Sequence, residues 1–431
     1  MKKSWVKVYV ILFVLWIYFA RYFIDTLAWF PSYANWVDEL LCIVGWGLVL
    51  LDKIERSRPR SLLGRSVVYF TVIALVSNLV ASNSLMFPLR YIVSFLKTVP
   101  VFYVIIRSEL SLVEVKRLGG VWIASCLAQI PMVFFQQRMF FFVGEVGDFD
   151  WGQGFLGTNA AHDVAELMVV LILYYFALMI RGVRVKRNML VILACLLALY
   201  LTFANHSYPE MAVILVLLIP DFTTLKINPR KLIRYGLGVM VGIGVVFWIS
   251  IVTDAQIIER YLWLPEFDQI GKIQVILELQ NLLSGVRSIF LGLGPATFSS
   301  SVALDMKLGV YYNQITAGLL ELAGEKGGSI LDIPFSTGIS VVAETGILGL
   351  IAFVAMYAKG VVFIRKHRED YREDNVIHAF YIAFNSLVII YVFLFFLTNF
   401  AENPILTLPF WLLMGCLVRC SDLMNSGVPE N

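Results

Sequence analysis

The stretch IHAFYIAFNSLVIIYVFLFFLT, residues 377–398, contains no Asp, Glu, Lys or Arg. A helix needs about 20 apolar residues to cross the hydrocarbon core of a bilayer, where every backbone polar group must be paired within the protein. This criterion, applied to the whole chain, predicts about twelve transmembrane helices, of which the second and the eighth are short. They lie near residues 8–24, 37–51, 66–83, 88–106, 118–136, 162–180, 188–204, 210–220, 235–253, 339–364, 377–398 and 403–419.

The composition supports the same fold class. The 431 residues are 59% hydrophobic and 15% charged, and the mean hydropathy is +0.79. Soluble chains are roughly 45–50% apolar and about 25% charged, so this chain has too little charge to cover a surface that faces water. Soluble, disordered and fibrous classes are excluded, and the net charge of +3 gives no reason to expect nucleic acid as a partner. We expect an all-α polytopic membrane protein.

The distribution of Lys and Arg predicts the orientation. Most of the 34 basic residues lie before the first span or in alternate loops, near residues 53–65, 107–117, 181–187, 226–234 and 365–372. Loops rich in Lys and Arg stay in the cytoplasm. The pattern therefore predicts cytoplasmic termini, including the tail 421–431. The first span carries basic residues at its start, but it is too long for a signal peptide and no cleavage site follows it.

Two sizeable loops face outward in this topology. Residues 254–338 separate the helices of 1–253 from those of 339–420, and within them KIQVILELQNLL, residues 272–283, has apolar residues near helical spacing. This pattern predicts an amphipathic helix on the outer surface. The other loop, about 137–161, contains the Gly-rich, acidic stretch GEVGDFDWGQGFLGTN. Large outer loops favour chemistry or ligand capture on the outer face.

Charged residues inside spans are expensive and are therefore functional candidates. Arg90 and Lys97 are two helical turns apart in one span and point the same way. Arg90 either serves a site or reaches the outer headgroups, and Lys97 either serves a site or pairs with a buried carboxylate such as Glu166. Glu344 lies within the span AETGILGL, where an unpaired carboxylate is costly, so we expect it to face the interior and meet an Arg or Lys.

Other polar residues lie at the outer ends of spans. His162, Asp163 and Glu166 begin one span, where the two acids could simply complement the helix N-terminus. A second polar group, which could be only a tight connection, consists of Asn205, His206, Ser207 and Glu210. The outer cationic candidates, which together could bind a diphosphate, are Arg21, Arg90, Arg138, Arg260, Lys272, Arg287 and Lys326.

No sequence motif indicates a metal or a nucleotide. The chain has no Walker loop, no His-Glu-x-x-His and no Gly-x-Ser-x-Gly, and it contains only four His residues. All five Cys lie in apolar runs without the spacing of zinc ligands. We expect neither a metal nor a cofactor.

The segment from Gly271 to Leu350 resembles the bacterial O-antigen polymerases and ligases (Wzy/WaaL-type). In that family a basic residue opens an outer amphipathic helix, a Gly-x-Gly-Pro-Gly-Thr-Phe-like turn follows, and Glu-x-Gly-Ile-x-Gly-Leu lies in the next span. Here these features are Lys272, the turn GLGPATF at 292–298, and ETGILGL at 344–350. The earlier stretch GTNAAH, residues 157–162, with Ala165 and Leu167, is also similar to a family pattern.

The sequence departs from the family pattern at two places. Lys272 stands where the family usually has Arg, which keeps the charge but weakens bidentate phosphate binding. Ser336 and Thr337 stand where the ligases carry His-Asn. The missing His favours a polymerase over a ligase.

The resemblance implies a fold of the C-type glycosyltransferase class and a site on the outer face of the bacterial inner membrane. Its substrates would be oligosaccharide repeat units on undecaprenyl diphosphate, and a polysaccharide co-polymerase that regulates chain length is a possible partner besides the membrane lipids. The expected reaction is metal-independent polymerisation that makes O-antigen, capsule or exopolysaccharide.

For this reaction we expect fixed cations to stabilise the leaving diphosphate, namely Lys272 and Arg287 with help from Arg90 and Arg138. Glu344 would orient a cation, and His162, His206 or Glu210 would take the acceptor proton. Lys97 and Ser336 are further substrate-binding candidates. Two alternatives stay open: a ligase that transfers finished glycan to an acceptor, and a lipid-linked glycan flippase or secondary transporter that uses Lys97 and Glu166 as a site within the membrane.

Overall fold

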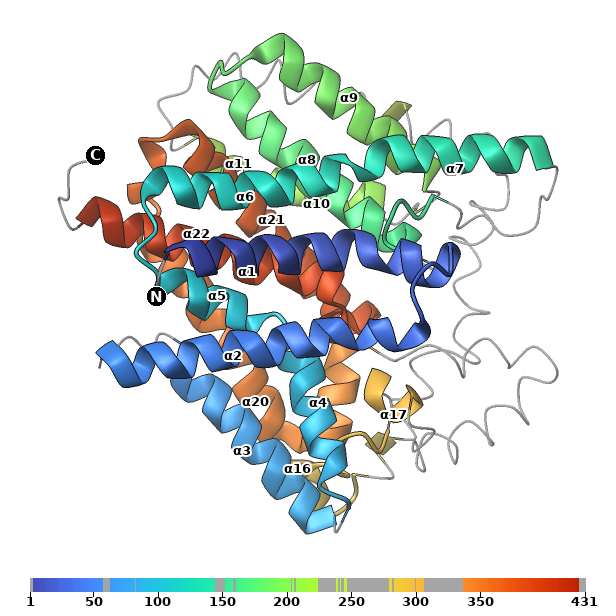
Figure 1. The fold of residues 1–431 in the computed structure, drawn as a ribbon, viewed down its shortest axis with the longest axis vertical. Helices are drawn as coiled ribbons and strands as arrows, with labels where there is room; N and C mark the ends of the chain where they lie inside the picture. The colour runs from blue at the N-terminus through green and yellow to red at the C-terminus, as the bar shows by residue number, and fades with distance from the viewer. Residues whose placement is uncertain are drawn as a thin grey trace.

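The computed structural model describes residues 3–56, 63–81, 83–143, 152–157, 160–202, 204, 207–223, 238, 241, 244–245, 279–280, 283–298, 300–305 and 336–425. Every regular element in these residues is a helix (Figure 1). The expected all-α class is therefore confirmed for the described chain.

Within the described residues, eight helical segments are long and apolar enough to cross a membrane. The first contains α1 (Lys3–Leu15) and two π-helical segments, Trp16–Ala20 and Tyr22–Thr26, and the fourth contains α6 (Leu112–Leu127) and most of α7 (Gln129–Val143). The others are formed by α2 (Val37–Arg56), α3 (Gly64–Ala81), α8 (Ala161–Ile180), α20 (Thr337–Lys366), α21 (Asn375–Leu397) and α22 (Pro404–Asn425).

A ninth span exists if α4 (Met86–Leu96) and α5 (Val99–Ile106), which meet at a bend of 57°, are taken together. The expected number was about twelve. The predicted spans at 188–204 and 210–220 correspond to α9 (Val185–Leu201), with 17 residues at the lower limit for a span, and to α10 (Ser207–Leu217), which with 11 residues is shorter than a bilayer requires. The predicted span at 235–253 lies largely outside the described residues.

The outer loop is described only in part. The expected amphipathic helix at 272–283 falls almost entirely outside the described residues. Two short helices of this loop are described, α16 (Val286–Leu291) and α17 (Ser301–Asp305). The remaining short elements are α11 (Ile219–Thr223) and the 3₁₀ turns Ser32–Trp36, Asp370–Arg372 and Phe400–Glu402.

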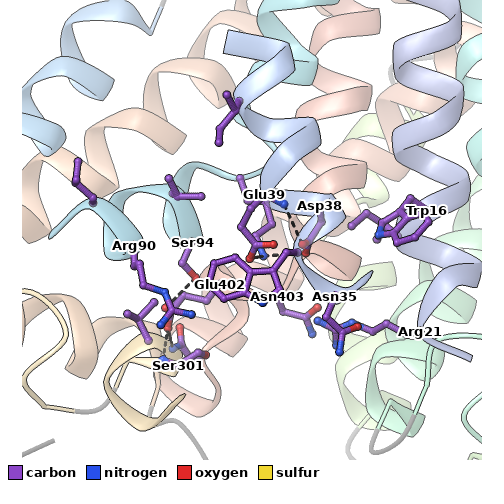
Figure 2. A pocket seen from close by; sticks show the side chains of 18 of the residues that line it. Trp16, Arg21, Asn35, Asp38, Glu39, Arg90, Ser94, Ser301, Glu402 and Asn403 are labelled. Atoms are coloured by element: carbon purple, nitrogen blue, oxygen red, sulfur yellow. Dashed lines mark hydrogen bonds and ion pairs between the residues drawn. The ribbon is translucent and has the colours of Figure 1, made fainter. Parts of the chain in front are cut away.

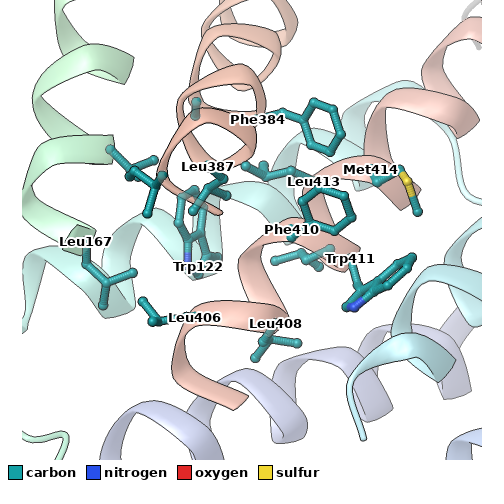
Figure 3. Close-up of a cluster of buried hydrophobic side chains, with 14 of the residues drawn as sticks. Trp122, Leu167, Phe384, Leu387, Leu406, Leu408, Phe410, Trp411, Leu413 and Met414 are labelled. Carbon is teal, nitrogen blue, oxygen red and sulfur yellow. The ribbon is translucent and has the colours of Figure 1, made fainter. Parts of the chain in front are cut away.

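The centre of the bundle is formed by α8 and α22, which are apolar on all sides and buried along almost their whole length. Figure 3 shows the packing between them, with Trp122 of α6, Leu167 of α8, Phe384 of α21 and Trp411 of α22. In contrast, α2 and α3 are buried over only about a third of their length or less and expose apolar side chains such as Leu51 and Leu79. This is the arrangement expected of a helix bundle surrounded by lipid.

The ends of the helices that carry the basic loops lie together. α1 begins and α22 ends at the same end of the bundle (Figure 1). At this end Lys7 forms an ion pair with Glu114 at 2.8 Å, and Arg181 donates a hydrogen bond to Asn375 at 2.9 Å. The alternation of basic and non-basic loops thus corresponds to two distinct ends of the bundle.

Asp374 connects the start of α21 to Lys116 of α6, and its carboxylate is expected to make the stability of the protein depend on pH. Its carboxylate accepts the N–H groups of Val376 and Ile377 at the start of α21 and forms an ion pair with Lys116 at 2.5 Å. Burial raises the pKa of Asp374, but the hydrogen bonds and the charge of Lys116 outweigh it and hold the pKa below its usual value. The contribution of Asp374 to folding is therefore present near neutral pH and lost as the pH falls below about 4.

We expect Asp374→Ala to lower the free energy of unfolding by about 1–2 kcal/mol near pH 7, because the helix loses its N-terminal cap. Thermal unfolding of the detergent-solubilised protein at pH 7 and at about pH 2 measures this effect, and the difference between variant and parent should shrink at the lower pH, where the carboxyl is protonated in both states. The neighbouring Glu373 is exposed, and Glu373→Ala should leave the melting temperature unchanged. An equal loss at both pH values would contradict the assigned role.

Candidate functional site

A cavity of about 770 Å³ opens at the end of the bundle opposite to the basic loops. Six elements form its wall: the π-helical end of the first span, the 3₁₀ turn Ser32–Trp36, the start of α2, α4, α17 and the turn at Phe400–Glu402 (Figure 2). Its charged lining residues are Arg21, Asp25, Asp38, Glu39, Arg90, Lys97 and Glu402. Trp16, Trp36, Asn35, Asn399 and Asn403 also line it.

Arg21 and Arg90 are the two cavity-lining cations without a carboxylate partner in the described chain. The guanidinium carbon of Arg90 lies 4.8 Å from the centre of the Trp36 ring, a cation–π contact that orients the side chain. Arg90 is half-buried and lines the cavity. Two arginines on one cavity can bind a multiply charged anion, because each planar guanidinium can hold two oxygens.

Lys97 lies at the bend between α4 and α5 and is almost fully buried. Its ammonium group forms ion pairs with Asp38 and Glu39, each at 2.8 Å. Lys97 thus pairs with buried carboxylates, but the first turn of α2 supplies them and not Glu166, which was the example named from the sequence. The sequence does predict that Arg90 and Lys97 share a face, and both line the cavity.

Glu402 connects three parts of the cavity wall. Its carboxylate accepts hydrogen bonds from the hydroxyl of Ser94 on α4 (3.0 Å), the N–H of Ser301 on α17 (2.7 Å) and the amide of Asn399. Burial raises the pKa of Glu402, and these three donors act in the opposite direction. Glu402 was not expected from the sequence, although Asn399, Glu402 and Asn403 form a polar group between two long apolar runs.

Glu344 lies in the interior, as expected, and is fully buried in α20. Its carboxylate accepts the backbone N–H groups of Ala296 (2.7 Å), Phe298 (3.1 Å) and Ser300 (2.9 Å). The expected partner was an Arg or Lys, whereas the contacts that the structure gives are to backbone amides. Two of these amides belong to the turn GLGPATF, so the two motifs that carry the family resemblance are in direct contact.

The backbones of these two motifs also meet at a pair of glycines. Gly292 and Gly346 both have positive φ, +74° and +67°. A Cβ atom on Gly346 would lie 2.3 Å from the carbonyl carbon of Phe290, and one on Gly292 would lie 2.5 Å from that of Glu344. The hydroxyl of Ser77 on α3 hydrogen-bonds to the carbonyl oxygens of Leu291 and Glu344 and so contacts both backbone segments that meet here. We call this contact the glycine junction.

The glycine junction and the two carboxylates explain how the outer loop reaches the cavity. The junction fixes residues 290–294 on α20, Glu344 fixes 296–300, and Glu402 fixes Ser301. Residues Ser301 and Val302 then form part of the cavity wall. The last described part of the outer loop is thus anchored to the membrane helices by backbone contacts.

The remaining candidates lie elsewhere. Arg287 on α16, Arg138 near the end of α7, and His162 at the start of α8 are exposed and do not line the cavity. Glu210 is hydrogen-bonded to Glu166, and Ser207 also contacts Glu166, at 3.3 Å. Ser336 caps the start of α20 by accepting the N–H of Ile339. Lys272 and His206 lie outside the described residues.

The Gly-rich outer loop also touches the site. Gly157 has a φ of +96°, and a Cβ atom there would lie 3.0 Å from Cβ of Arg21 and 3.4 Å from a carboxylate oxygen of Asp25. Nearby, Asn403 donates to both carboxylate oxygens of Asp163 at 2.9 Å, which links α8 to the turn that carries Glu402. The start of the pattern GTNAAH therefore lies against the cavity wall.

Within the described chain, no group of three or more His, Cys, Asp or Glu is placed to hold a metal ion. The five cysteines are buried and form no disulfide. The chemistry that the cavity can perform depends on its arginines, carboxylates and amides.

Comparison with known proteins gives no assignment. No protein-family model matches the chain, and no curated protein is significantly similar to it.

Proposed function

We propose that the protein is a metal-independent membrane glycosyltransferase that polymerises undecaprenyl-diphosphate-linked oligosaccharide repeat units. The observation that carries this proposal is the cavity with Arg21 and Arg90, two cations without a carboxylate partner in the described chain. A lipid diphosphate is an anion that suits two guanidinium groups. A glycan linked to it would occupy the amide-, carboxylate- and Trp-lined remainder of the cavity.

The distribution of charge supports a site on the outer face of the bacterial inner membrane. The described helix ends that lead into the basic loops lie at one end of the bundle and the cavity at the other. If the basic end is cytoplasmic, as the positive-inside rule requires, the cavity faces outward. Repeat units must then be moved to the outer leaflet before they reach it.

The contact between the two motifs supports the resemblance to the O-antigen polymerases and ligases. GLGPATF and ETGILGL are far apart in the sequence, and a chance similarity gives no reason for them to meet. In the described chain Glu344 of the second motif binds the backbone of the first. The absence of the His that the ligases carry near Ser336 favours a polymerase within that family.

The proposed mechanism assigns the leaving group to the cavity cations. As the bond between the donor sugar and its diphosphate breaks, negative charge collects on the diphosphate. Arg21 and Arg90 stabilise that charge from fixed positions, which is usually the largest catalytic contribution in such a site. These two residues replace Lys272 and Arg287 as our first assignment, because they line the cavity, whereas Arg287 does not.

Deletion of the gene tests the proposal. Extracted polysaccharide and lipid-linked glycans are separated on a gel, and the deletion strain should contain single lipid-linked repeat units without a ladder of longer products. Long polymer that remains on its lipid carrier would indicate a ligase instead. Restoration of the ladder by the cloned gene is the control for secondary effects.

A flippase or secondary transporter is the second candidate, and one observation favours it. The span formed by α4 and α5 is broken at Lys97, and substrate sites in transporters are commonly built at discontinuous helices. The same gene deletion distinguishes a flippase from a polymerase. If the protein is a flippase, lipid-linked repeat units accumulate on the cytoplasmic face of the membrane in the deletion strain. The proposed site within the membrane would be Lys97 with Asp38 and Glu39 and not, as expected, Lys97 with Glu166.

A further inference from the structure

We infer that Asp25 is the general base that takes the proton of the acceptor hydroxyl. This inference rests on the proposed function. Asp25 follows Arg21 by one helical turn at the end of the first span, and both side chains line the cavity. Gly157 of the Gly-rich outer loop packs against the same two residues.

Four carboxylates line the cavity, and three of them are held by donors. Asp38 and Glu39 are each paired with Lys97 at 2.8 Å. Glu402 receives three hydrogen bonds and is only 6% exposed. These three carboxylates hold the cavity wall together, and a proton on any of them would weaken a contact that positions α2, α4 or α17.

Asp25 differs from these three carboxylates in its hydrogen-bond partners and in its exposure. Within the described chain its carboxylate has no hydrogen-bond or ion-pair partner, and its side chain is exposed to the cavity. A general base must come within about 2.6–3.2 Å of the proton that it abstracts, so an accessible carboxylate with no competing donor meets this requirement. The candidates expected from the sequence that the structure describes, His162 and Glu210, do not line the cavity.

The proposed transfer of the donor glycan to the acceptor hydroxyl needs no reactant besides the two substrates. The acceptor oxygen forms a bond to the anomeric carbon of the donor sugar, and the bond from that carbon to the diphosphate oxygen breaks. The electron pair of the broken bond leaves with the lipid diphosphate, whose charge Arg21 and Arg90 stabilise. The hydroxyl proton passes to the carboxylate of Asp25 and from there to water in the open cavity.

The experiment uses the purified full-length protein in nanodiscs. The substrates are lipid-linked repeat units extracted from the deletion strain, and undecaprenyl diphosphate is the binding probe. The variants are Asp25→Asn, which keeps the shape and removes the charge, Asp25→Glu, which restores a carboxylate, and Glu373→Gln, an exposed control at the opposite end of the bundle. Thermal unfolding of each variant is measured in parallel.

We expect D25N to lower turnover by at least about 100-fold, the usual contribution of a general base. Its melting temperature and its affinity for undecaprenyl diphosphate should not fall, because Arg21 and Arg90 remain and a negative charge beside them is removed. D25E should recover at least about a tenth of the parent rate, and E373Q should match the parent.

Three results would overturn the inference in different ways. D25N turnover within threefold of an active parent removes Asp25 as the base and leaves the proposed function intact. Loss of probe binding or a lower melting temperature in D25N, or an equally inactive D25E, assigns the residue a structural role. A parent that neither binds undecaprenyl diphosphate nor extends lipid-linked units removes the proposed function and the inference together.

Discussion

Replacement of Arg21 and Arg90 by Gln should reduce polymer formation to background in the double variant and by about 10²–10³-fold in each single variant. This is the usual cost of removing one fixed donor from a site that stabilises developing negative charge. Undecaprenyl diphosphate should also bind more weakly, because both guanidinium groups face the cavity. The assay is the length distribution of polysaccharide made by variants that reach the membrane at parental levels.

The matched controls are Arg138→Gln and Arg287→Gln, which remove the same chemical group from exposed positions outside the cavity. We expect both to keep long polymer. Arg90→Lys is informative as well, since it keeps the positive charge but loses the planar guanidinium group that can bind two phosphate oxygens. Its polymer formation should lie between that of R90Q and that of the parent. Loss of polymer in R287Q together with normal polymer in R90Q would return the site to the residues that the sequence favoured.

The second large effect is expected at the glycine junction. Gly346→Ala places a methyl group 2.3 Å from the carbonyl carbon of Phe290, and this neighbour is backbone and cannot rotate away. The φ and ψ of Gly346, +67° and −172°, lie in a region that is essentially restricted to glycine and costs other residues about 1–3 kcal/mol. The strain and the steric clash together should destabilise the protein by about 3 kcal/mol or more.

Gly120→Ala and Gly47→Ala are the controls, because both glycines lie in helices and a Cβ atom at either would meet no atom within 4 Å. These substitutions should stabilise slightly, by up to about 1 kcal/mol. The measurements are the yield of folded protein from the membrane and the melting temperature. A melting temperature of G346A equal to that of G120A would show that the junction does not contribute to stability.

The sequence was sufficient for those features that depend on composition and periodicity. Long apolar runs predicted the helices, and the two-turn spacing of Arg90 and Lys97 placed both on the cavity. The number of spans stays a prediction, because hydropathy does not distinguish a full span from a short apolar helix such as α10, which packs one face against α8.

Partners across helices could not be predicted in this way. Lys97 was expected either to serve a site or to pair with a buried carboxylate, with Glu166 as an example. Which carboxylate it meets depends on how α2 packs against α4 and α5, and no local pattern encodes this. The buried Glu344 was expected to need a cation, yet three backbone amides can satisfy a carboxylate equally well. Asp25 and Glu402 were overlooked because each lies at the end of a long apolar run and belongs to no motif.

The glycine junction also constrains the order in which the chain can assemble. Gly292 leaves the ribosome before Gly346, and at about 5–20 residues per second the interval is a few seconds. During that time Ser77 is already in place on α3, but the carbonyl of Glu344 that it also binds has not been made. The outer segment that ends in the cavity wall can therefore dock only after α20 is inserted, so the cavity is completed late in biosynthesis. A chain that stops before residue 344 would reach the membrane with most of its helices but without an assembled site.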